Sequence, residues 1–414
     1  MKPLKNLLQL STILTMVTSS MLAMPAVSAA GIAAPAAANS SNAVSTNTGS
    51  QILLTSQSPI TSGAVLKKYV WKTMRGQAAA SVNVNVVEVD LTNPNVKLDM
   101  MTGAGGQFTK KNTVSGMAQE TGAVAGVNGD FFNTQAEGVP DGPEIAAGQV
   151  MATPLMQMQG MYSFAIDHNN QPIIDSFSFQ GSVAAKDGSS FPLRGINKTS
   201  YWLDDGTYGM TDGMFIYTSA FASDSRSNDG AIIPSEILVQ NGVIQQIALN
   251  SVIPGLVPTN AYILRTNGKA TDYVKQHLKV GDPLKVDDQI IPIDSSKNYD
   301  TKQFKMMVGG ETLLVVDGKP SILTRDINNF SGYAYVARTA IGYSKDQKTV
   351  YLITAERNSD SKGMSIPELQ SVMVQVGVWK GMVLDGGGST TMVARPLGDF
   401  AAADVGTPQN GVER

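Results

Sequence analysis

The alternation of apolar and polar residues predicts a fold in which strands outnumber helices. From Val82 to Leu91, apolar residues alternate with polar ones, and the phase of the alternation changes at Val86-Val87. We expect a strand with one buried face and a bulge where the phase changes. Val96 to Met101 is predicted to be its hairpin partner, across the turn Asn93-Pro94-Asn95.

Short apolar runs separated by turn signals fill the middle of the chain, from about Tyr162 to Ile293. They predict strands, with one short helix from Ala270 to Leu278. The turn signals are Asp187-Gly188, Asp205-Gly206, Asn241-Gly242 and Asn267-Gly268. Outside this region we expect strands at Ala123–Val127, Arg338–Tyr343, Thr349–Thr354 and Gly381–Leu384, and a hairpin at Asp317-Gly318.

Two further helices are predicted from their end signals. Lys110 to Glu120 has Asn112 or Thr113 as its cap and ends at Gly122. In the second helix Ser365 and Glu368 have the spacing of a capping box, and the helix ends at Gly377. The expected fold class is therefore α+β, with mixed, strand-rich sheets, few helices and a single domain with a strand-rich middle region.

The first residues have the composition of an export signal. Lys2 and Lys5 precede a mostly apolar stretch, and Val27-Ser28-Ala29 is a small-residue cleavage site. We expect a signal peptide over residues 1–29, a flexible Ala/Ser/Asn-rich linker over 30–63 and one folded domain over 64–414. A membrane anchor is the alternative, but the stretch is short for a bilayer span. We expect a secreted, extracellular protein, with association to the cell surface left open and no transmembrane segment in the mature chain.

The composition narrows the partners. The chain has no cysteine, two histidines and a formal net charge of −3. Disulfides are therefore absent, and a transition-metal site of His and Cys is nearly excluded. A weakly acidic chain without a basic block argues against nucleic acid as a partner. We expect no required cofactor; the metal is left open, with an all-oxygen calcium site as the candidate.

The run Asp385-Gly386-Gly387-Gly388-Ser389-Thr390-Thr391 follows a buried strand. Glycines let the backbone approach a ligand closely, and the exposed amides with the Ser389 and Thr390 hydroxyls can cradle an oxyanion or phosphate. Asp385 places a carboxylate beside that cradle. The run lacks the Gly-Lys-Ser/Thr of a nucleotide P-loop. A tight turn between strands is the structural alternative.

Two other motifs carry polar groups at strand ends. Asn128-Gly129-Asp130-Phe131-Phe132 offers polar side chains and rings for a sugar, although the motif alone favours a turn with two core phenylalanines. Arg338 begins a strand whose following residues look buried, so its guanidinium needs a carboxylate or a bound anion. Arginine matches two phosphate oxygens at once, and a structural ion pair is the alternative.

Other titratable residues have strong structural explanations. The capping box accounts for Glu368 without any substrate. Glu356-Arg357 follows a strand end, where a catalytic carboxylate and a rim salt bridge are equally compatible with the sequence. We expect His168 and His277 on the surface, because neither lies within a motif.

Together these motifs resemble the phosphodiester glycosidase family. Asn128–Phe132, Ala337–Tyr343, Ser365–Leu369 and Leu384–Thr390 occur in the order and spacing of that family, and the resemblance runs from about Val65 to Arg414. It implies hydrolysis of the bond between a sugar's anomeric carbon and a phosphodiester phosphate. For bacterial members it implies a phosphodiester-linked carbohydrate, an exopolysaccharide or a cell-wall glycan.

The resemblance also implies a site drawn from the motif residues. The expected catalytic residues are Asp385, Glu368 and Arg338. The expected substrate-binding residues are Asn128, Asp130, Thr339, Gly386, Gly387, Gly388 and Ser389. Two departures stand out. Asp130 fills a place where relatives often have another small residue, and Gly411-Val412-Glu413-Arg414 resembles the start of a closing segment that normally continues, so we expect a chain truncated at its C-terminus.

A glycosidic phosphate departs as an anion, so its leaving needs charge neutralisation more than protonation. Arg338 and the amides from Gly386 to Ser389 are expected to supply it. A carboxylate stabilises the anomeric carbon or activates water, with Asp385 as first choice and Glu368 as second. Two alternatives remain: a calcium-dependent phosphodiesterase of wall teichoic acid, and a non-catalytic module that binds wall glycan.

Overall fold

The structure is a computed structural model that describes residues 49–132, 134, 137–155, 161–201, 206–226, 232–325 and 332–414. The expected signal peptide and the expected linker up to residue 48 lie outside the described residues. The rest of the linker expectation is wrong, because Gln51–Thr61 forms strand β1. Most of its side chains are exposed and only Ile60 is buried, so an edge strand has here the polar composition of a linker.

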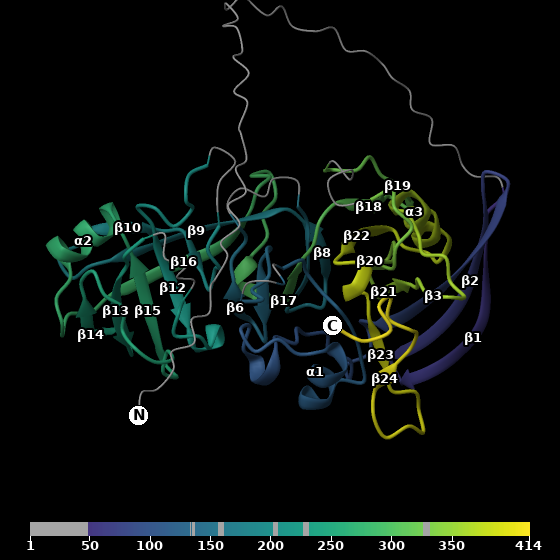
Figure 1. The fold of residues 1–414 in the computed structure, drawn as a ribbon, viewed down its shortest axis with the longest axis horizontal. Coiled ribbons are helices and arrows are strands. Elements are labelled where there is room, and N and C mark those ends of the chain that lie inside the picture. Colours follow the sequence, from purple (N-terminus) through teal and green to yellow (C-terminus); the bar gives the residue numbers. More distant parts are fainter. Residues whose placement is uncertain are drawn as a thin grey trace, which may run out of the picture. The chain divides into compact units, whose positions relative to one another are not determined.

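An eight-stranded antiparallel sheet joins the two ends of the described chain. Its strand order is β1-β2-β3-β21-β20-β22-β18-β19, so the early strands lie directly beside the late ones (Figure 1). After β1 the strands are β2 (Ala64–Arg75), β3 (Ala78–Asp90), β21 (Thr349–Ala355), β20 (Arg338–Tyr343), β22 (Lys380–Leu384), β18 (Leu313–Val316) and β19 (Lys319–Pro320).

Strand β3 is buried on both faces, which corrects two sequence expectations. Val82, Val84 and Val86 pack in the same apolar cluster as helix α3 (Ile366–Gln375), whereas Val87 and Val89 belong to a cluster on the opposite face. The pairing of β3 with β2 and β21 is continuous through Val86 and Val87, so there is no bulge. The apolar phase changes because the second face also becomes buried.

The expected hairpin partner of this strand, Val96 to Met101, is not a strand. Both edges of β3 are already occupied by β2 and β21. Val96, Leu98 and Met100 instead pack, partly exposed, against the apolar cluster that contains Val87 and Val89.

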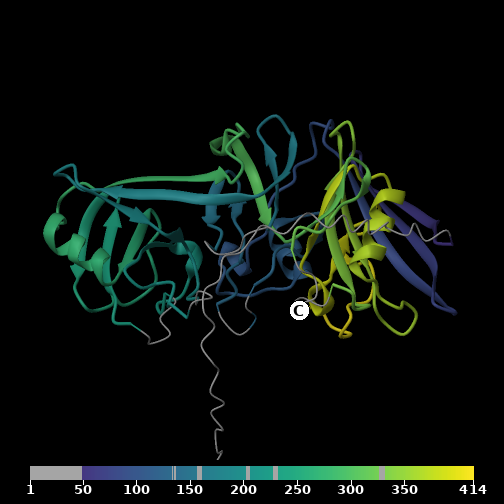
Figure 2. The same cartoon turned by 90° about the horizontal axis from the view of Figure 1, so that it is seen from above.

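Four smaller sheets contain the other strands. Their strand orders are β6-β5-β17-β7-β8, β10-β9-β16, β11-β12-β15-β13-β14 and β24-β23-β4. The strand bounds are β4 (Ala125–Val127), β5 (Glu144–Ala146), β6 (Gln149–Ala152), β7 (Ser163–Asp167), β8 (Pro172–Asp175), β9 (Phe177–Ala184), β10 (Ser190–Leu193), β11 (Gly195–Ile196), β12 (Met214–Thr218), β13 (Ser235–Gln240), β14 (Val243–Ala248), β15 (Ala261–Thr266), β16 (Lys285–Pro292), β17 (Phe304–Gly309), β23 (Met392–Ala394) and β24 (Ala403–Asp404). The long strands β9 and β16 run side by side, antiparallel, through the strand-rich middle region (Figure 2). The pairing of β11 with β12 is parallel, so the sheets are mixed and the expected α+β, strand-rich class is confirmed.

The predicted helices are confirmed with small shifts at their ends. Helix α1 is Val114–Thr121, capped by the Thr113 side chain and ended by Gly122 in the left-handed region. Helix α2 is Lys269–His277, and α3 begins with the predicted capping box. Among the described residues, no helix is long and apolar enough to cross a membrane.

The predicted turns are mostly confirmed. Asp187-Gly188, Asn241-Gly242 and Asp317-Gly318 connect paired strands. Asn267-Gly268 instead precedes α2, with Gly268 as its N-cap, because the chain turns there into a helix. Asp205 lies outside the described residues.

Candidate active site

The start of β20 and the end of β22 bring Arg338 and Asp385 together. The two strands pair with Thr339 opposite Leu384, and one further step in this register places Arg338 beside Asp385. Both residues line one cavity of about 210 Å³, together with Gly386, Gly387 and Phe131. Arg338 and Asp385, both named from sequence, therefore line one cavity whose wall includes Gly386 and Gly387.

The Asp385 carboxylate is held by its own loop. The Gly386 amide donates to Oδ1 at 2.8 Å, and the Ser389 hydroxyl donates to the same carboxylate. Burial raises the pKa of Asp385, and these hydrogen bonds and the nearby Arg414 oppose that rise. A carboxylate with a raised pKa is a stronger base, which suits a group that accepts a proton from water.

Arg338 is 3% exposed and is surrounded by backbone carbonyls. Its Nε donates to Met364 O at 2.9 Å, and its Nη2 donates to Ala334 O at 2.8 Å and to Gly332 O at 3.3 Å. Burial lowers the pKa of Arg338 to about 10, so the side chain stays charged at neutral pH. These carbonyl oxygens fix the orientation of the guanidinium, whose positive charge can attract an anion.

Asn128 connects three segments of the site. Its Nδ2 donates to the backbone oxygen of Asp385 at 2.8 Å, and its Oδ1 accepts from Thr339 Oγ1 at 2.7 Å and from the Thr391 amide at 3.1 Å. Thr339 is fully buried, so its hydroxyl holds Asn128 in place. The expectation that Thr339 contacts substrate is not supported by this position.

The glycine run offers fewer amides than the sequence suggests. The amide of Gly386 is bound to Asp385, that of Gly387 to Ala337 O at 2.8 Å, and that of Ser389 to Gly386 O at 3.2 Å. Gly386 and Gly388 pack closely against neighbouring groups, whereas Gly387 has a positive φ of 62° and no atom near its Cβ position. A Cβ on Gly388 would lie 2.9 Å from Nη2 of Arg414, and one on Gly386 would lie 3.1 Å from Ala337 O.

The Asp130 carboxylate packs directly against Gly142 and Gly309, at positions where any Cβ would overlap it. The carboxylate accepts from the amides of Phe131 at 2.7 Å and Gly142 at 2.6 Å. Burial, reinforced by the neighbouring Asp141, raises the pKa of Asp130 well above its usual range. Asp130 thus has the environment of a carboxylic acid that keeps its proton.

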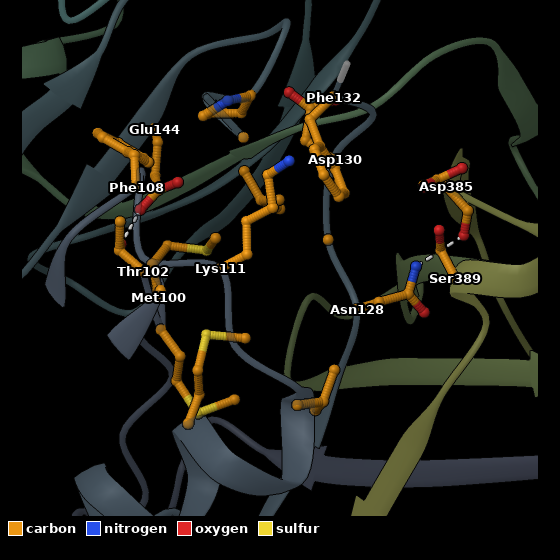
Figure 3. A pocket seen from close by; sticks show the side chains of 18 of the residues that line it. Met100, Thr102, Phe108, Lys111, Asn128, Asp130, Phe132, Glu144, Asp385 and Ser389 are labelled. Carbon is orange, nitrogen blue, oxygen red and sulfur yellow. Dashed lines mark hydrogen bonds between the residues drawn. The ribbon is translucent and has the colours of Figure 1, made fainter. Parts of the chain in front are cut away.

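A second cavity, of about 150 Å³, also has Asp385 in its wall (Figure 3). Of the residues named from sequence, Asn128, Asp130, Asp385 and Ser389 line it. Phe132, from the same motif as Asn128, also lines it, together with polar and aromatic residues that no local motif indicated, among them Thr102, Phe108, Lys111, Glu144 and Arg414. Asp385 lies in the wall of both cavities, which makes it the central group of the site.

Glu144 is the clearest titratable residue that sequence reasoning missed. It is 5% exposed, and the Thr102 hydroxyl donates a hydrogen bond to its carboxylate. Burial raises its pKa to about 7. A carboxyl group that titrates near neutrality in a cavity wall is a candidate proton donor or acceptor. The sequence gives little indication of this role. Glu144 begins a strand of only three residues, directly after the turn Pro140-Asp141-Gly142-Pro143, and lies in no recognisable motif.

Charged side chains near the two cavities interact electrostatically with Asp130 and Asp385. The ammonium group of Lys198 is 1% exposed, donates to Pro140 O at 2.7 Å and lies near Asp130, Asp141 and Glu144; burial lowers its pKa to about 8. Burial raises the pKa of both Asp141 and Glu311, and the Asp385 charge adds to each rise. Arg325 pairs with Glu311 at 2.7 Å. No local motif marks these residues, which only tertiary packing brings to the site.

Glu368 is placed differently from the expectation that it is catalytic. Its Oε1 accepts from Arg75 Nε at 2.9 Å, and its Oε2 accepts from Arg75 Nη2 at 2.9 Å and from the Ser365 amide at 3.0 Å. It lines neither cavity. Its carboxylate is occupied by a salt bridge and a helix cap, so the structural explanation fits this residue.

The remaining candidates lie outside the two cavities. Glu356 accepts from Asn85 and Asn358 at 2.8 and 2.9 Å. His168 is exposed. His277, the last residue of α2, is half-buried and contacts Asp187. Within the part of the chain that the structure describes, no three His, Cys, Asp or Glu side chains are grouped to hold a metal ion.

Comparison with known proteins supports the family resemblance. Residues 234–414 match the family model described as phosphodiester glycosidase, which confirms the resemblance over that part of the chain. The matched part contains Arg338 and Asp385, and it begins after Asn128 and Asp130. No curated protein sequence matches the chain.

Two of the solved structures found by comparison share the fold. A hypothetical protein from Synechocystis superposes with a TM-score of 0.62 at 17% identity, over 80% of this chain and 58% of its own. This chain therefore spans less than two thirds of that protein's length. A putative exported protein from Burkholderia pseudomallei has a TM-score of 0.65 at 20% identity, over 81% of this chain and 72% of its own. The zebrafish N-acetylglucosamine-1-phosphodiester alpha-N-acetylglucosaminidase catalytic domain, auto-inhibited by its pro-peptide, has a TM-score of 0.44 at 13% identity, over 87% of this chain and 81% of its own.

Proposed function

With the phosphodiester glycosidase match over residues 234–414 as the premise, we propose that the two cavities around Asp385 form the active site of such an enzyme. The observation that supports this best is the position of Asp385. It lines one cavity with Arg338 and the glycines, and a second with Asn128, Asp130 and Ser389. Asp385 thus lies in the wall of a cavity that Arg338 also lines, and in the wall of a cavity with several polar groups that could bind a sugar.

The phosphate occupies the cavity beside Arg338. Its charge increases as the bond to the sugar breaks, and a buried guanidinium stabilises that developing charge more strongly than water does. The sugar occupies the cavity lined by Asn128, Asp130 and Ser389. Burial raises the pKa of Asp130 well above its usual range, which favours the protonated form, and this form donates a hydrogen bond to a sugar oxygen.

Asp385 acts on the anomeric carbon. Its carboxylate stabilises the positive charge that develops there and takes a proton from the attacking water. The water oxygen forms the new bond to the anomeric carbon. The bond between that carbon and the phosphate oxygen breaks, and its electron pair leaves with the phosphate. The products are a free sugar and a phosphomonoester.

The substrate belongs to the material outside the cell. The export signal predicted over residues 1–29 and the family resemblance favour a phosphodiester-linked exopolysaccharide or cell-wall glycan as the target. In this proposal Arg338 and Asp385 supply both charges for these steps; a calcium-dependent reaction is the alternative.

A panel of sugar-1-phosphodiesters, incubated with and without chelator, tests the activity. We expect free sugar and phosphomonoester from the wild type, and a loss of turnover of at least about a hundredfold in Asp385→Asn. Asp346→Asn, the same change in the exposed turn between β20 and β21, is the matched control and should keep wild-type turnover. Full turnover in a folded Asp385→Asn variant would show that Asp385 has no catalytic role.

The same assay separates the alternatives. Cleavage at phosphorus, as in a calcium-dependent teichoic acid phosphodiesterase, would release sugar phosphate and place heavy oxygen from labelled water in the phosphate. Cleavage at carbon places that label in the sugar. Binding to purified wall without any product would favour the non-catalytic module.

A further inference from the structure

A third cavity, the largest of the three at about 380 Å³, adjoins the proposed active site. It lies against the face of the main sheet that does not carry α3, among residues of one apolar cluster. Leu98, Phe164, Met306, Ile341, Leu352 and Leu384 are typical of its wall. Its lining is therefore apolar over most of its extent.

This apolar cavity shares part of its wall with the cavity lined by Asn128, Asp130 and Ser389. Met100, Met101, Met117, Asn128, Gly129 and Val308 line both. Leu384 lines the apolar cavity and also the cavity beside Arg338, in which the phosphate is proposed to lie. A hydrocarbon chain esterified to that phosphate would therefore reach the apolar cavity along Leu384.

The cavity also reaches the surface. Lys97, Thr121 and Gly122 are exposed and form part of its lining. Partly exposed apolar side chains such as Leu98 and Val127, which pack against the core cluster, continue the lining inward. A long ligand could thus enter between the 97–99 segment and the end of α1.

The size and chemistry of the cavity indicate its occupant. Empty apolar cavities destabilise a protein in proportion to their volume. An engineered apolar cavity of about 150 Å³ stays dry and binds benzene, so 380 Å³ accommodates a considerably larger hydrocarbon. Four of the lining residues are methionines, whose unbranched side chains adapt to flexible apolar chains.

We propose that this cavity binds the hydrocarbon chain of the alcohol that is esterified to the phosphate. The substrate would then be a sugar or glycan joined through a phosphodiester to a long-chain alcohol. This inference rests on the proposed function and narrows its substrate class. Hydrolysis at the anomeric carbon would release the sugar and leave the alkyl phosphate, with its chain, as the second product.

Calorimetric titration of the full chain with octyl phosphate and with ethyl phosphate tests the inference without requiring turnover. Each buried methylene adds to affinity, so we expect octyl phosphate to bind at least about tenfold more tightly than ethyl phosphate. Equal affinities would overturn the inference.

Variants that fill the cavity show where the chain binds. Ala125→Phe and Leu98→Trp place larger side chains in the cavity wall and should each abolish most of the octyl advantage. Ala79→Phe, on an exposed stretch of β3, should preserve it. If the advantage survives in folded Ala125→Phe and Leu98→Trp, the chain binds elsewhere and the inference is wrong. If octyl phosphate binds only after residues 1–48 are removed, the occupant is the N-terminal segment, which also overturns it.

Turnover separates this inference from the proposed function. We expect the octyl ester of a sugar-1-phosphate to have a KM at least about tenfold below that of the ethyl ester, with a similar kcat. Selective binding of octyl phosphate without turnover of either ester would refute the glycosidase activity and leave the apolar cavity as a binding site. Turnover of both esters with equal KM would refute the inference and leave the glycosidase intact.

Discussion

Removing the Glu368 carboxylate should reduce stability and leave turnover intact. The Arg75 and Glu368 side chains are each only 14% exposed, and two hydrogen bonds of 2.9 Å join them. A hydrogen bond between charged groups contributes about 1.5–3 kcal/mol, and loss of a helix cap costs about 1 kcal/mol. We therefore expect Glu368→Ala to lower the free energy of unfolding by about 2–4 kcal/mol.

For a folded unit that extends to Arg414 from residue 48, a loss of this size lowers Tm by about 3–5 °C. Scanning calorimetry gives the Tm, and kcat on a sugar-1-phosphodiester, measured well below it, should stay within about twofold of wild type. Glu368→Gln keeps an acceptor for the Ser365 amide, so it should lose roughly half as much stability.

Asp385→Asn provides the opposite case. Burial raises the pKa of Asp385, so the ionised carboxylate is held at a cost and its neutralisation should not lower Tm, while turnover falls. The reasoning about Glu368 would be refuted by a large loss of kcat in Glu368→Gln at an unchanged Tm. That result would restore Glu368 as a catalytic group.

Three further predictions concern the cavity walls. Arg338→Lys keeps the charge but loses the planar fork that contacts Met364 O and Ala334 O, so kcat/KM should fall by about tenfold or more at neutral pH; unchanged kinetics would contradict a role in holding phosphate. Burial raises the pKa of Glu144 from 4.5 to about 7, so the folded state favours its protonated form, and stability is lost as pH rises from about 4.5 through 7. Glu144→Gln should flatten the fall of Tm with pH over that window, whereas parallel Tm curves would show that Glu144 does not titrate there. A Cβ on Gly309 would meet the Asp130 carboxylate and lie 2.7 Å from Gly142 Cα, so Gly309→Ala should cost about 1–3 kcal/mol in chemical unfolding; Gly105→Ala, at a positive φ with nothing near its Cβ, is a control for backbone strain alone.

Local pattern determined a large part of this fold. The ends of α1 and α3 follow from Thr113, Gly122 and the Ser365-Glu368 pair, because capping is an interaction between residues a few positions apart. Strands β20, β21 and β22 were predicted from continuous apolar runs bounded by turns. Arg338 and Asp385 were selected for the same reason: each is a charged residue at the end of a buried strand.

Partner choice was decided by tertiary structure. The sequence placed β3 against Val96–Met101, its nearest neighbour, whereas the fold pairs it with β21 from far along the chain. Separate apolar clusters cover the two faces of β3, and burial of the second face at Val87 and Val89 produces the change of phase that looked like a bulge. A strand's own residues specify which faces are apolar, and they do not specify which distant strand will cover its edge.

Much of the site was likewise decided only by the folded chain. Asn128 could be selected as a polar residue at a strand end, yet its contacts with Asp385, Thr339 and Thr391 depend on β4 lying beside β23. Glu144 and Lys198 have ordinary local sequences, and their shifted pKa values arise from burial among distant segments. Sequence alone determines which charged groups lie at strand ends. Burial and the proximity of other charges determine which of them can do chemistry, and both are properties of the packed structure.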